Sequence, residues 1–353
     1  MKKLQLSKTS KVNFATYGMV ILAYVVFQLL VSRDMLSSTM KGQLVPICAY
    51  VTMALSLNLT VGILGELSLG HAGFMSVGAF AGAVAAAALP VANDGVRLAL
   101  SMVIGALLAG LVGVLVGIPV LRLNGDYLAI VTLAFGQIIK SVVENLYIGM
   151  DSRGLHASFL ENRINFQDGG KMILNGAMGV NGIKKISTFT AGFVLIMLSL
   201  VLIFNLVNSR SGRAIMALRD NRIAAESVGI PVTKYKLMAF VTSSAIAGAA
   251  GCLFALGQNT ITANKFDFNT SILILVFVVL GGQGKMWGSI LAAAFLTVLP
   301  ETPAMRGLAD YRMLIYAIVL ILVMLATNNP VLQSFFGRIF HRSEEREKGG
   351  TAS

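Results

Sequence analysis

Charged residues are scarce in this sequence. Only 12% of its 353 residues are Asp, Glu, Lys or Arg, whereas 56% are hydrophobic, and soluble domains carry about 25% charged residues. This scarcity excludes an ordinary water-soluble domain. The apolar residues form continuous runs, many near the ~20 residues that a membrane-spanning helix needs, and not the alternating ten-residue segments of a transmembrane barrel. The composition therefore predicts an all-α fold, a polytopic helical membrane protein.

Histidine and cysteine are also rare. The three histidines, His71, His156 and His341, lie too far apart for a zinc-binding HExxH motif. Cys48 and Cys252 each lie inside an apolar run, which predicts neither a disulfide nor a metal site. No arrangement of residues indicates covalent catalysis. We therefore expect no enzyme activity, and no metal or cofactor bound by this chain.

A complete nucleotide-binding loop is missing as well. The segment 281–285 reads GGQGK, but the phosphate-loop pattern needs glycine where Val279 stands and Ser or Thr where Met286 stands. The net charge of +12 does not indicate nucleic-acid binding, because no basic domain with interleaved aromatic residues holds the cations. We expect membrane lipid, and no nucleic acid, among its partners.

The apolar runs predict about ten transmembrane helices. The N-terminal run is too long for a signal peptide, and Ser32-Arg33-Asp34 is not a small-residue cleavage site, so we interpret it as a retained helix. The runs cover residues 14–31, 44–64, 72–89, 98–116, 127–148, 189–207, 237–257, 271–280, 289–299 and 313–326.

This count places both termini on the cytoplasmic side if the lysines near the N-terminus lie inside. We expect one transmembrane domain over residues 1–340 and a polar, disordered tail over 341–353. Residues 149–187 are then the only sizeable extracytoplasmic loop and can form a small cap. Residues 208–236 fall in the cytoplasm.

Residues 208–236 form a basic island between two apolar runs. Its lysine and arginine content places it on the cytoplasmic side. Asp220 or Asn221 can cap a short helix, Gly229 suits the left-handed position that ends it, and Pro231 follows. A helix of about eight residues is ~12 Å long, too short to span a membrane, so we expect another protein to hold it. The cations are Arg210, Arg213, Arg219, Arg222, Lys234 and Lys236.

Residues 62–74 interrupt two apolar runs with four glycines and several polar side chains. Irregular backbone at membrane depth is tolerated only where protein or a water-filled cavity covers it, and ionisable groups there indicate function. We therefore predict a gate or substrate pathway that includes Glu66, Ser68, Gly70 and His71. The alternative is that the glycines permit close packing and His71 only bonds a carbonyl.

Gly125-Asp126-Tyr127 opens the fifth run. Asp126 can cap this helix and favour its positive end, and substrate contact is the alternative. We include Asp126 and Tyr127 among the candidate pathway residues.

Several segments together resemble the permease family of ATP-binding cassette (ABC) importers for branched-chain amino acids, in particular the longer, M-type subunit. The resemblance covers residues from about 45 to 326. Its most recognisable blocks are GELSLGHAGF (65–74), GDYLAIVTLAFGQI (125–138), SGRAIMALRDNRIAAESVGI (211–230), KLMAFVTSSAIAGAAG (236–251) and GGQGKMWG (281–288).

The resemblance implies a type II ABC importer permease in a bacterial cytoplasmic membrane. Its partners would be a homologous second permease subunit, two ABC ATPase subunits that use the ATP, and an extracytoplasmic substrate-binding protein. The third block resembles the family's cytoplasmic coupling segment, although Arg222 stands where the family usually has an acid. By similarity, the residues expected to contact the ATPase are Arg213, Arg219, Asp220, Ala224, Ala225, Glu226, Gly229, Ile230 and Pro231.

The expected cargo is leucine, isoleucine or valine, and urea, amides or nucleosides are the alternative within the wider family. Two other classes stay open on the residues alone. A proton-coupled secondary transporter could use Glu66, His71 or Asp126 as a relay, and a membrane scaffold would carry nothing. The short capped helix argues against the first, and the glycine-rich break argues against the second.

Overall fold

The computed structural model describes residues 8–35, 37–123, 125–151, 154–160 and 170–299, together with 314, 318 and 321. The chain divides into two units, residues 1–301 and 302–353, and the description below concerns the first. The predicted tenth span (313–326), the domain boundary at 340 and the tail (341–353) therefore lie outside it.

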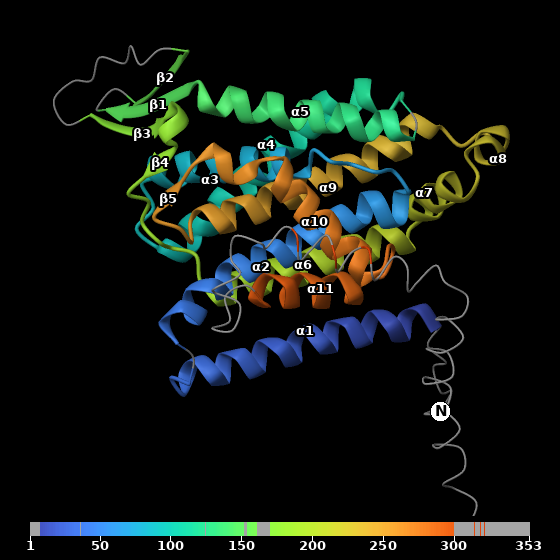
Figure 1. Cartoon of the computed structure of the whole chain (residues 1–353), viewed down its shortest axis with the longest axis horizontal. Helices are drawn as coiled ribbons and strands as arrows, with labels where there is room; N and C mark the ends of the chain where they lie inside the picture. Colours follow the sequence, from blue (N-terminus) through green and yellow to red (C-terminus); the bar gives the residue numbers. More distant parts are fainter. Residues whose placement is uncertain are drawn as a thin grey trace, which may run out of the picture. The chain divides into compact units, whose positions relative to one another are not determined.

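The first unit is a helical bundle (Figure 1). In the described part, seven helices are long and apolar enough to cross a membrane. They are α1 (Lys8–Ser32), α2 (Ser38–Asn58, prolonged by the π-helical turn Leu59–Leu64), α3 (His71–Ala88), α4 (Asp94–Val120), α5 (Asp126–Glu144), α6 (Phe189–Asn208) and α9 (Val232–Ala255).

Two shorter apolar helices, α10 (Phe268–Gly281) and α11 (Met286–Val298), follow. Helices thus occupy nine of the predicted runs. The polytopic helical fold is confirmed.

Helix α9 packs against α2, α3 and α4 at the centre of the bundle. Small residues allow the backbones of these helices to lie close together. A Cβ atom on Gly78 of α3 would lie 2.0 Å from the carbonyl oxygen of Gly248 on α9, and one on Gly113 of α4 would lie 2.0 Å from Ser244 Oγ. Such close contact is typical of helices that associate without a hydrophobic driving force. These close glycine contacts fix the position of α9.

Helix α1 lies at the edge of the bundle and packs along α6 through aromatic rings. The rings of Tyr24 and Phe193 stack with centroids 4.2 Å apart, and Tyr17 meets Phe204 edge to face at 5.5 Å. Its outer face is apolar, with Leu22 66% exposed and Leu29 54% exposed. An exposed apolar face on a helix of this length fits contact with lipid.

A small antiparallel sheet covers one end of the bundle. Its strand order is β2-β1-β3-β4-β5. This corrects the fifth predicted run, because α5 ends at Glu144 and residues 146–148 belong to β1, whose edges pair with β2 and β3. The strands are β1 (Leu146–Asp151), β2 (Gly154–Phe159), β3 (Lys171–Asn175), β4 (Val180–Asn181) and β5 (Thr260–Ile261).

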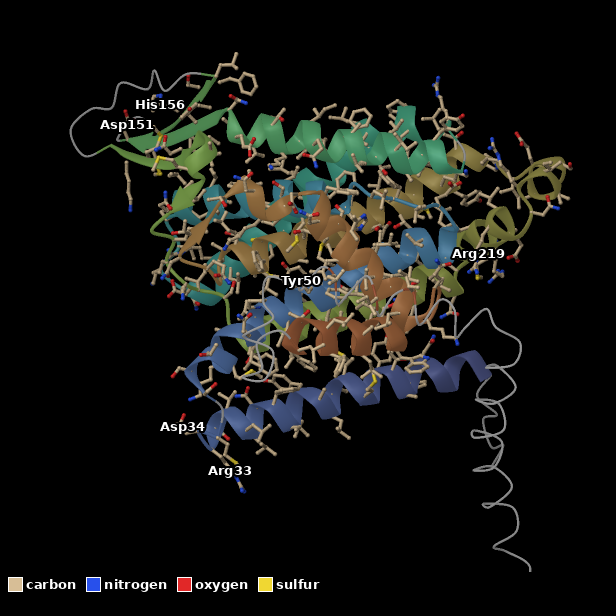
Figure 2. All side chains as sticks on the ribbon, in the orientation of Figure 1. Arg33, Asp34, Tyr50, Asp151, His156 and Arg219 are labelled. Carbon is tan, nitrogen blue, oxygen red and sulfur yellow. The ribbon has the colours of Figure 1, made fainter. Side chains whose placement is uncertain are left out.

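The polar helices α7 (Arg210–Asp220) and α8 (Arg222–Ser227) lie at the other end of the bundle. Helix α6 connects the two ends, and its 20 residues extend about 30 Å, the thickness of a bilayer core. Figure 2 shows Asp151 and His156 at the sheet end and Arg219 at the α7 end. The sheet and the α7–α8 pair therefore lie at opposite ends of the bundle, about the thickness of a bilayer core apart.

Candidate functional site

Helices α7 and α8 form a projection whose turns are capped by local side chains. Ser209 Oγ accepts a hydrogen bond from Gly212 N at 3.1 Å and begins α7. Asn221 Oδ1 accepts one from Ala224 N at 3.0 Å and begins α8. Of the two caps predicted from sequence, Asn221 is the one used, because Asp220 is the last residue of α7.

The end of α8 follows the predicted chemistry. Gly229 has φ of +84°, a left-handed conformation that costs other residues about 1–2 kcal/mol. Its N–H donates to Glu226 O at 3.0 Å, and Ile230 N donates to Ala225 O at 3.1 Å. Pro231 then precedes the first turn of α9. The short capped helix is confirmed as a local structure.

The surface around α8 is more apolar than its polar sequence predicts. Ile223 is 79% exposed and Val228 is 76% exposed. Of the predicted contact residues, Ala224 and Glu226 are exposed, as are Arg213, Arg219, Asp220, Gly229 and Pro231, while Ile230 is half-buried and Ala225 is buried. The missed signal was the presence of two large aliphatic residues within a polar stretch.

The segment between α2 and α3 is a true break in the helices. The π-helical turn ends at Gly65, whose φ is +80°, and α3 begins only at His71. Gly70 lies against α5, where a Cβ atom would come within 2.1 Å of Thr132 O, and Leu69 N donates to Thr132 Oγ1 at 3.0 Å. We call residues 62–71 the break.

His71 is fully buried at the end of the break. Its Nε2 atom lies 2.8 Å from Ser56 Oγ on α2 and 3.1 Å from Ser243 Oγ on α9. Its partners are therefore hydroxyl groups of two neighbouring helices and not a carbonyl. Ser68 is also buried, and within the described part of the chain Ser68 Oγ and His71 Nδ1 have no hydrogen-bond partner.

Two cationic side chains attach the break to the residues on either side of α8. The Arg219 Nη1 atom, at the end of α7, donates to the Gly62 carbonyl oxygen. The Lys236 Nζ atom, in the first turns of α9, donates to Glu66 Oε1. The Lys236 side chain is only 4% exposed and that of Glu66 is 15% exposed. The helices on either side of α8 are thus each joined to the break by a charge-assisted contact.

The turn between α10 and α11 holds the break from another side. Gly284 N donates to Asn58 Oδ1 at 2.8 Å, and Asn58 Nδ2 donates to Ser289 Oγ at 2.9 Å. The glycine-rich GGQGK segment is therefore a packed turn beside Gly62, where a Cβ atom would lie 2.2 Å from Gly284 N. This contact gives the segment a structural role.

The remaining candidate residues begin α5. Asp126 is its first helical residue and follows Gly125, whose φ is +59°; the Asp126 side chain lies outside the described part. Tyr127 is 74% exposed, so its ring points away from the packed core. Glu66, Ser68, Gly70 and His71 thus lie in one continuous segment, the break, and Tyr127 lies outside it. Among the described residues, no group of three or more His, Cys, Asp or Glu side chains could hold a metal ion.

Comparison with known proteins gives the family. Over residues 39–324 the chain matches the family described as branched-chain amino acid transport system / permease component. The chain belongs to this family. It is therefore a multi-pass membrane protein of the transport permease type, in accord with its helices.

Individual relatives cover much of this permease. It is 36% identical over 286 residues to the high-affinity branched-chain amino acid transport system permease protein LivM of Salmonella typhimurium and to that of Escherichia coli. Each match covers 78% of this chain and 66% of the relative, so the chain spans just under two thirds of these relatives. The ribose import permease protein RbsC of Escherichia coli is 25% identical over 277 residues, 76% of this chain and 78% of that protein. No solved structure matches the chain.

Proposed function

We propose that this permease is a transmembrane subunit of an ATP-binding cassette importer that carries leucine, isoleucine and valine across the cytoplasmic membrane. The names of the relatives at 36% identity support the substrate class. The structural observation that carries the proposal is the capped α7–α8 projection joined to the break by Arg219 and Lys236. In an importer the ATPase subunits lie outside the lipid bilayer, so the permease needs a connection that carries their movement to its transmembrane helices.

The proposed assembly contains a homologous second permease subunit, two ABC ATPase subunits and an extracytoplasmic substrate-binding protein. ATP is bound and hydrolysed by the ATPase subunits, and this chain performs no chemistry. The α7–α8 projection faces the cytoplasm and docks on an ATPase subunit through α8. The sheet end faces the outside, where the binding protein delivers the solute.

The mechanism is a population shift between two packings of one bundle. A partner that binds one packing more tightly moves the equilibrium toward it. The ATPase subunits would displace α8, and the charge-assisted contacts of Arg219 and Lys236 would transmit that displacement to Gly62 and Glu66. Glycines at 62 and 70 let the break pack directly against the α10–α11 turn and α5, so a displacement of the break is felt by both.

Transport by the reconstituted complex tests the proposal. Lipid vesicles containing the permease pair and the ATPases, supplied with binding protein outside and ATP inside, should accumulate labelled leucine. Replacing ATP by a non-hydrolysable analogue should stop accumulation. Accumulation without nucleotide under a proton gradient would instead identify a proton-coupled carrier.

A further inference from the structure

A cavity of about 350 Å³ lies at the end of the bundle that carries α7 (Figure 1). Its walls come from α1, from the last turn of α6, from the π-helical turn after α2 and from the turn between α10 and α11. Small-molecule sites have volumes of about 300–1,000 Å³. The cavity can therefore hold a small solute or one polar group of a larger molecule.

One side of the cavity carries a cation without an acidic partner. Lys285 lines the cavity and is exposed, and its stem lies beside Gly282, where a Cβ atom would be 3.4 Å from Lys285 Cδ. Among the described residues, no acidic side chain pairs with its ammonium group. A second cation, Arg213, lies next to the wall, because its Nη1 atom donates to Asn208 O at 3.2 Å. The cavity therefore favours an anionic group.

Neutral polar side chains complete the polar part of the wall. Asn13 of α1 and Asn208 of α6 line the cavity, and in the part of the chain that the structure describes neither side chain amide has a partner. Each amide offers two N–H donors. Together with Lys285 they present donors from three separate elements, which suits a group with several acceptor oxygens, such as a phosphate.

Trp287 places the cavity at the surface of the membrane. It is the second residue of α11, lines the cavity and is 44% exposed. Tryptophan is enriched where hydrocarbon meets water, because its ring is apolar and its N–H is polar. Lys285 directly precedes α11, so its ammonium group lies at the level of the lipid headgroups.

The rest of the wall is apolar and continues into a surface that fits lipid. Ile63, Phe204 and Met286 line this part of the cavity. In the adjoining turn of α6, Val201 is 43% exposed and Leu202 is 45% exposed. A molecule whose anionic group fills the cavity can therefore extend an acyl chain along α6. A phospholipid matches both parts, whereas a free anion matches only the first.

We propose that this cavity binds the headgroup of an anionic phospholipid. Its phosphate accepts hydrogen bonds from Lys285 and from the amides of Asn13 and Asn208, and its acyl chain lies on α6. Basic pockets between membrane helices recognise anionic headgroups in this way. The bound lipid joins α1 and α6 to the α10–α11 turn, which holds the break through Gly284 and Asn58. The inference is independent of the proposed cargo.

Tryptophan fluorescence tests the inference directly, because Trp287 is the only tryptophan in the sequence. Full-length permease is placed in phosphatidylcholine nanodiscs that contain increasing fractions of dibrominated phosphatidylglycerol or dibrominated phosphatidylcholine, whose bromine atoms quench an indole ring that they contact. We expect phosphatidylglycerol to reach half-maximal quenching at about one fifth of the mole fraction, the effect of one lysine beside an anionic lipid. Equal quenching by the two lipids would overturn the proposal.

A matched pair of variants locates the binding. Lys285→Gln removes the cavity cation, and Lys265→Gln removes an exposed cation of the 3₁₀ turn Ala263–Phe266, which follows β5 at the sheet end. We expect Lys285→Gln to abolish the preference for phosphatidylglycerol and Lys265→Gln to retain it. Retention of the preference by both variants would place the anionic lipid elsewhere and contradict the assignment.

Salt distinguishes a lipid headgroup from a free anion. Sodium phosphate and sodium chloride at equal ionic strength should weaken the preference for phosphatidylglycerol equally, because both act by screening. A larger effect of phosphate would show that the cavity takes the free anion, and the lipid proposal would fail. The result is separable from that of the proposed function, since the nanodiscs expose both faces of the permease to the same lipids and contain neither ATPase nor cargo.

Discussion

At the scale of single residues, the break depends on an ionic contact, Lys236 with Glu66, that the bundle shields from water. Lys236 lies on a helix that is otherwise apolar along most of its length, and its ammonium group is covered by the packed core. A buried charge is tolerated when an opposite charge meets it, and removing one partner leaves the other uncompensated. Glu66 and Lys236 must therefore be considered as a unit.

The first prediction concerns this unit. Lys236→Met should lower the free energy of unfolding by about 3–5 kcal/mol, the cost of breaking a buried ion pair from one side. Adding Glu66→Gln to this variant should restore much of the lost unfolding free energy, because the buried carboxylate is then no longer charged. Thermal unfolding of the purified permease in detergent measures both effects.

Lys234→Met provides the control, since Lys234 is exposed on the same helix. We expect it to change stability by no more than about 0.5 kcal/mol, as surface substitutions generally do. Equal destabilisation by the two methionine variants would show that the Lys236–Glu66 contact does not contribute.

At the scale of elements, helix α8 and the contacts of α9 with α3 and α4 are stabilised in different ways. Helix α8 has only six residues, too few for a stable helix by itself, so its caps and Ala225 hold it in place. Its exposed aliphatic side chains contribute little to that fold. The α3–α9 and α4–α9 seams, in contrast, depend on glycines that admit the neighbouring backbone.

The second prediction concerns docking through α8. The double variant Ile223→Ser, Val228→Ser should leave the permease folded in the membrane but weaken its association with the ATPase subunits, because it removes two exposed apolar contacts. Truncating a residue at an interface hot spot costs about 2 kcal/mol or more, which is more than tenfold in affinity. Co-purification of the ATPase measures the loss.

Leu155→Ser is the matched control for docking. Leu155 is 53% exposed and lies on β2 at the sheet end, where the proposed assembly has no ATPase. Its variant should retain the ATPase at the wild-type level. Retention of the ATPase by the α8 variant as well would remove the docking hypothesis.

The third prediction concerns the α3–α9 seam. Gly78→Ala places a Cβ atom 2.0 Å from the Gly248 carbonyl oxygen, so the helices must separate, at a cost of about 1–3 kcal/mol. Gly110→Ala on α4 places its Cβ at an ordinary 3.5 Å from Ala245 Cβ and gains helix propensity. We expect the first to lower the thermal unfolding midpoint and the second to leave it unchanged or raise it. The opposite order would contradict the packing.

At the scale of the whole molecule, the bundle has two unlike ends. One carries the small sheet, and the other carries α7 and α8. In the proposed assembly the membrane lies between these two ends, so each end meets different partner proteins. The proposed orientation assigns the α7–α8 end to the cytoplasm, as its cations favour.

The fourth prediction tests this orientation by cysteine labelling. The native Cys48 and Cys252 are 3% and 0% exposed, so they should react little with a membrane-impermeant maleimide. Ile223→Cys should react only after the cells are opened, and Leu155→Cys should react in intact cells. The reverse pattern would place α8 outside and contradict the proposed coupling to a cytoplasmic ATPase.

Local sequence by itself determined the class of this protein, most of its membrane helices, and the capped helix that Asn221 begins and Gly229 ends. These features follow from run length, capping chemistry and backbone freedom, each of which acts over a few residues. The glycine-rich break was predictable for the same reason.

Only the tertiary structure decided which groups meet. It pairs Lys236 with Glu66, 170 residues away, and seats His71 against Ser243, 172 residues away. It also turned residues 146–148 from the predicted helix into a strand, because β1 pairs with two other strands. The periodicity of the sequence describes only residues near one another along the chain, so it cannot predict such contacts. The free energy of these contacts arises only when distant segments pack together and exclude water.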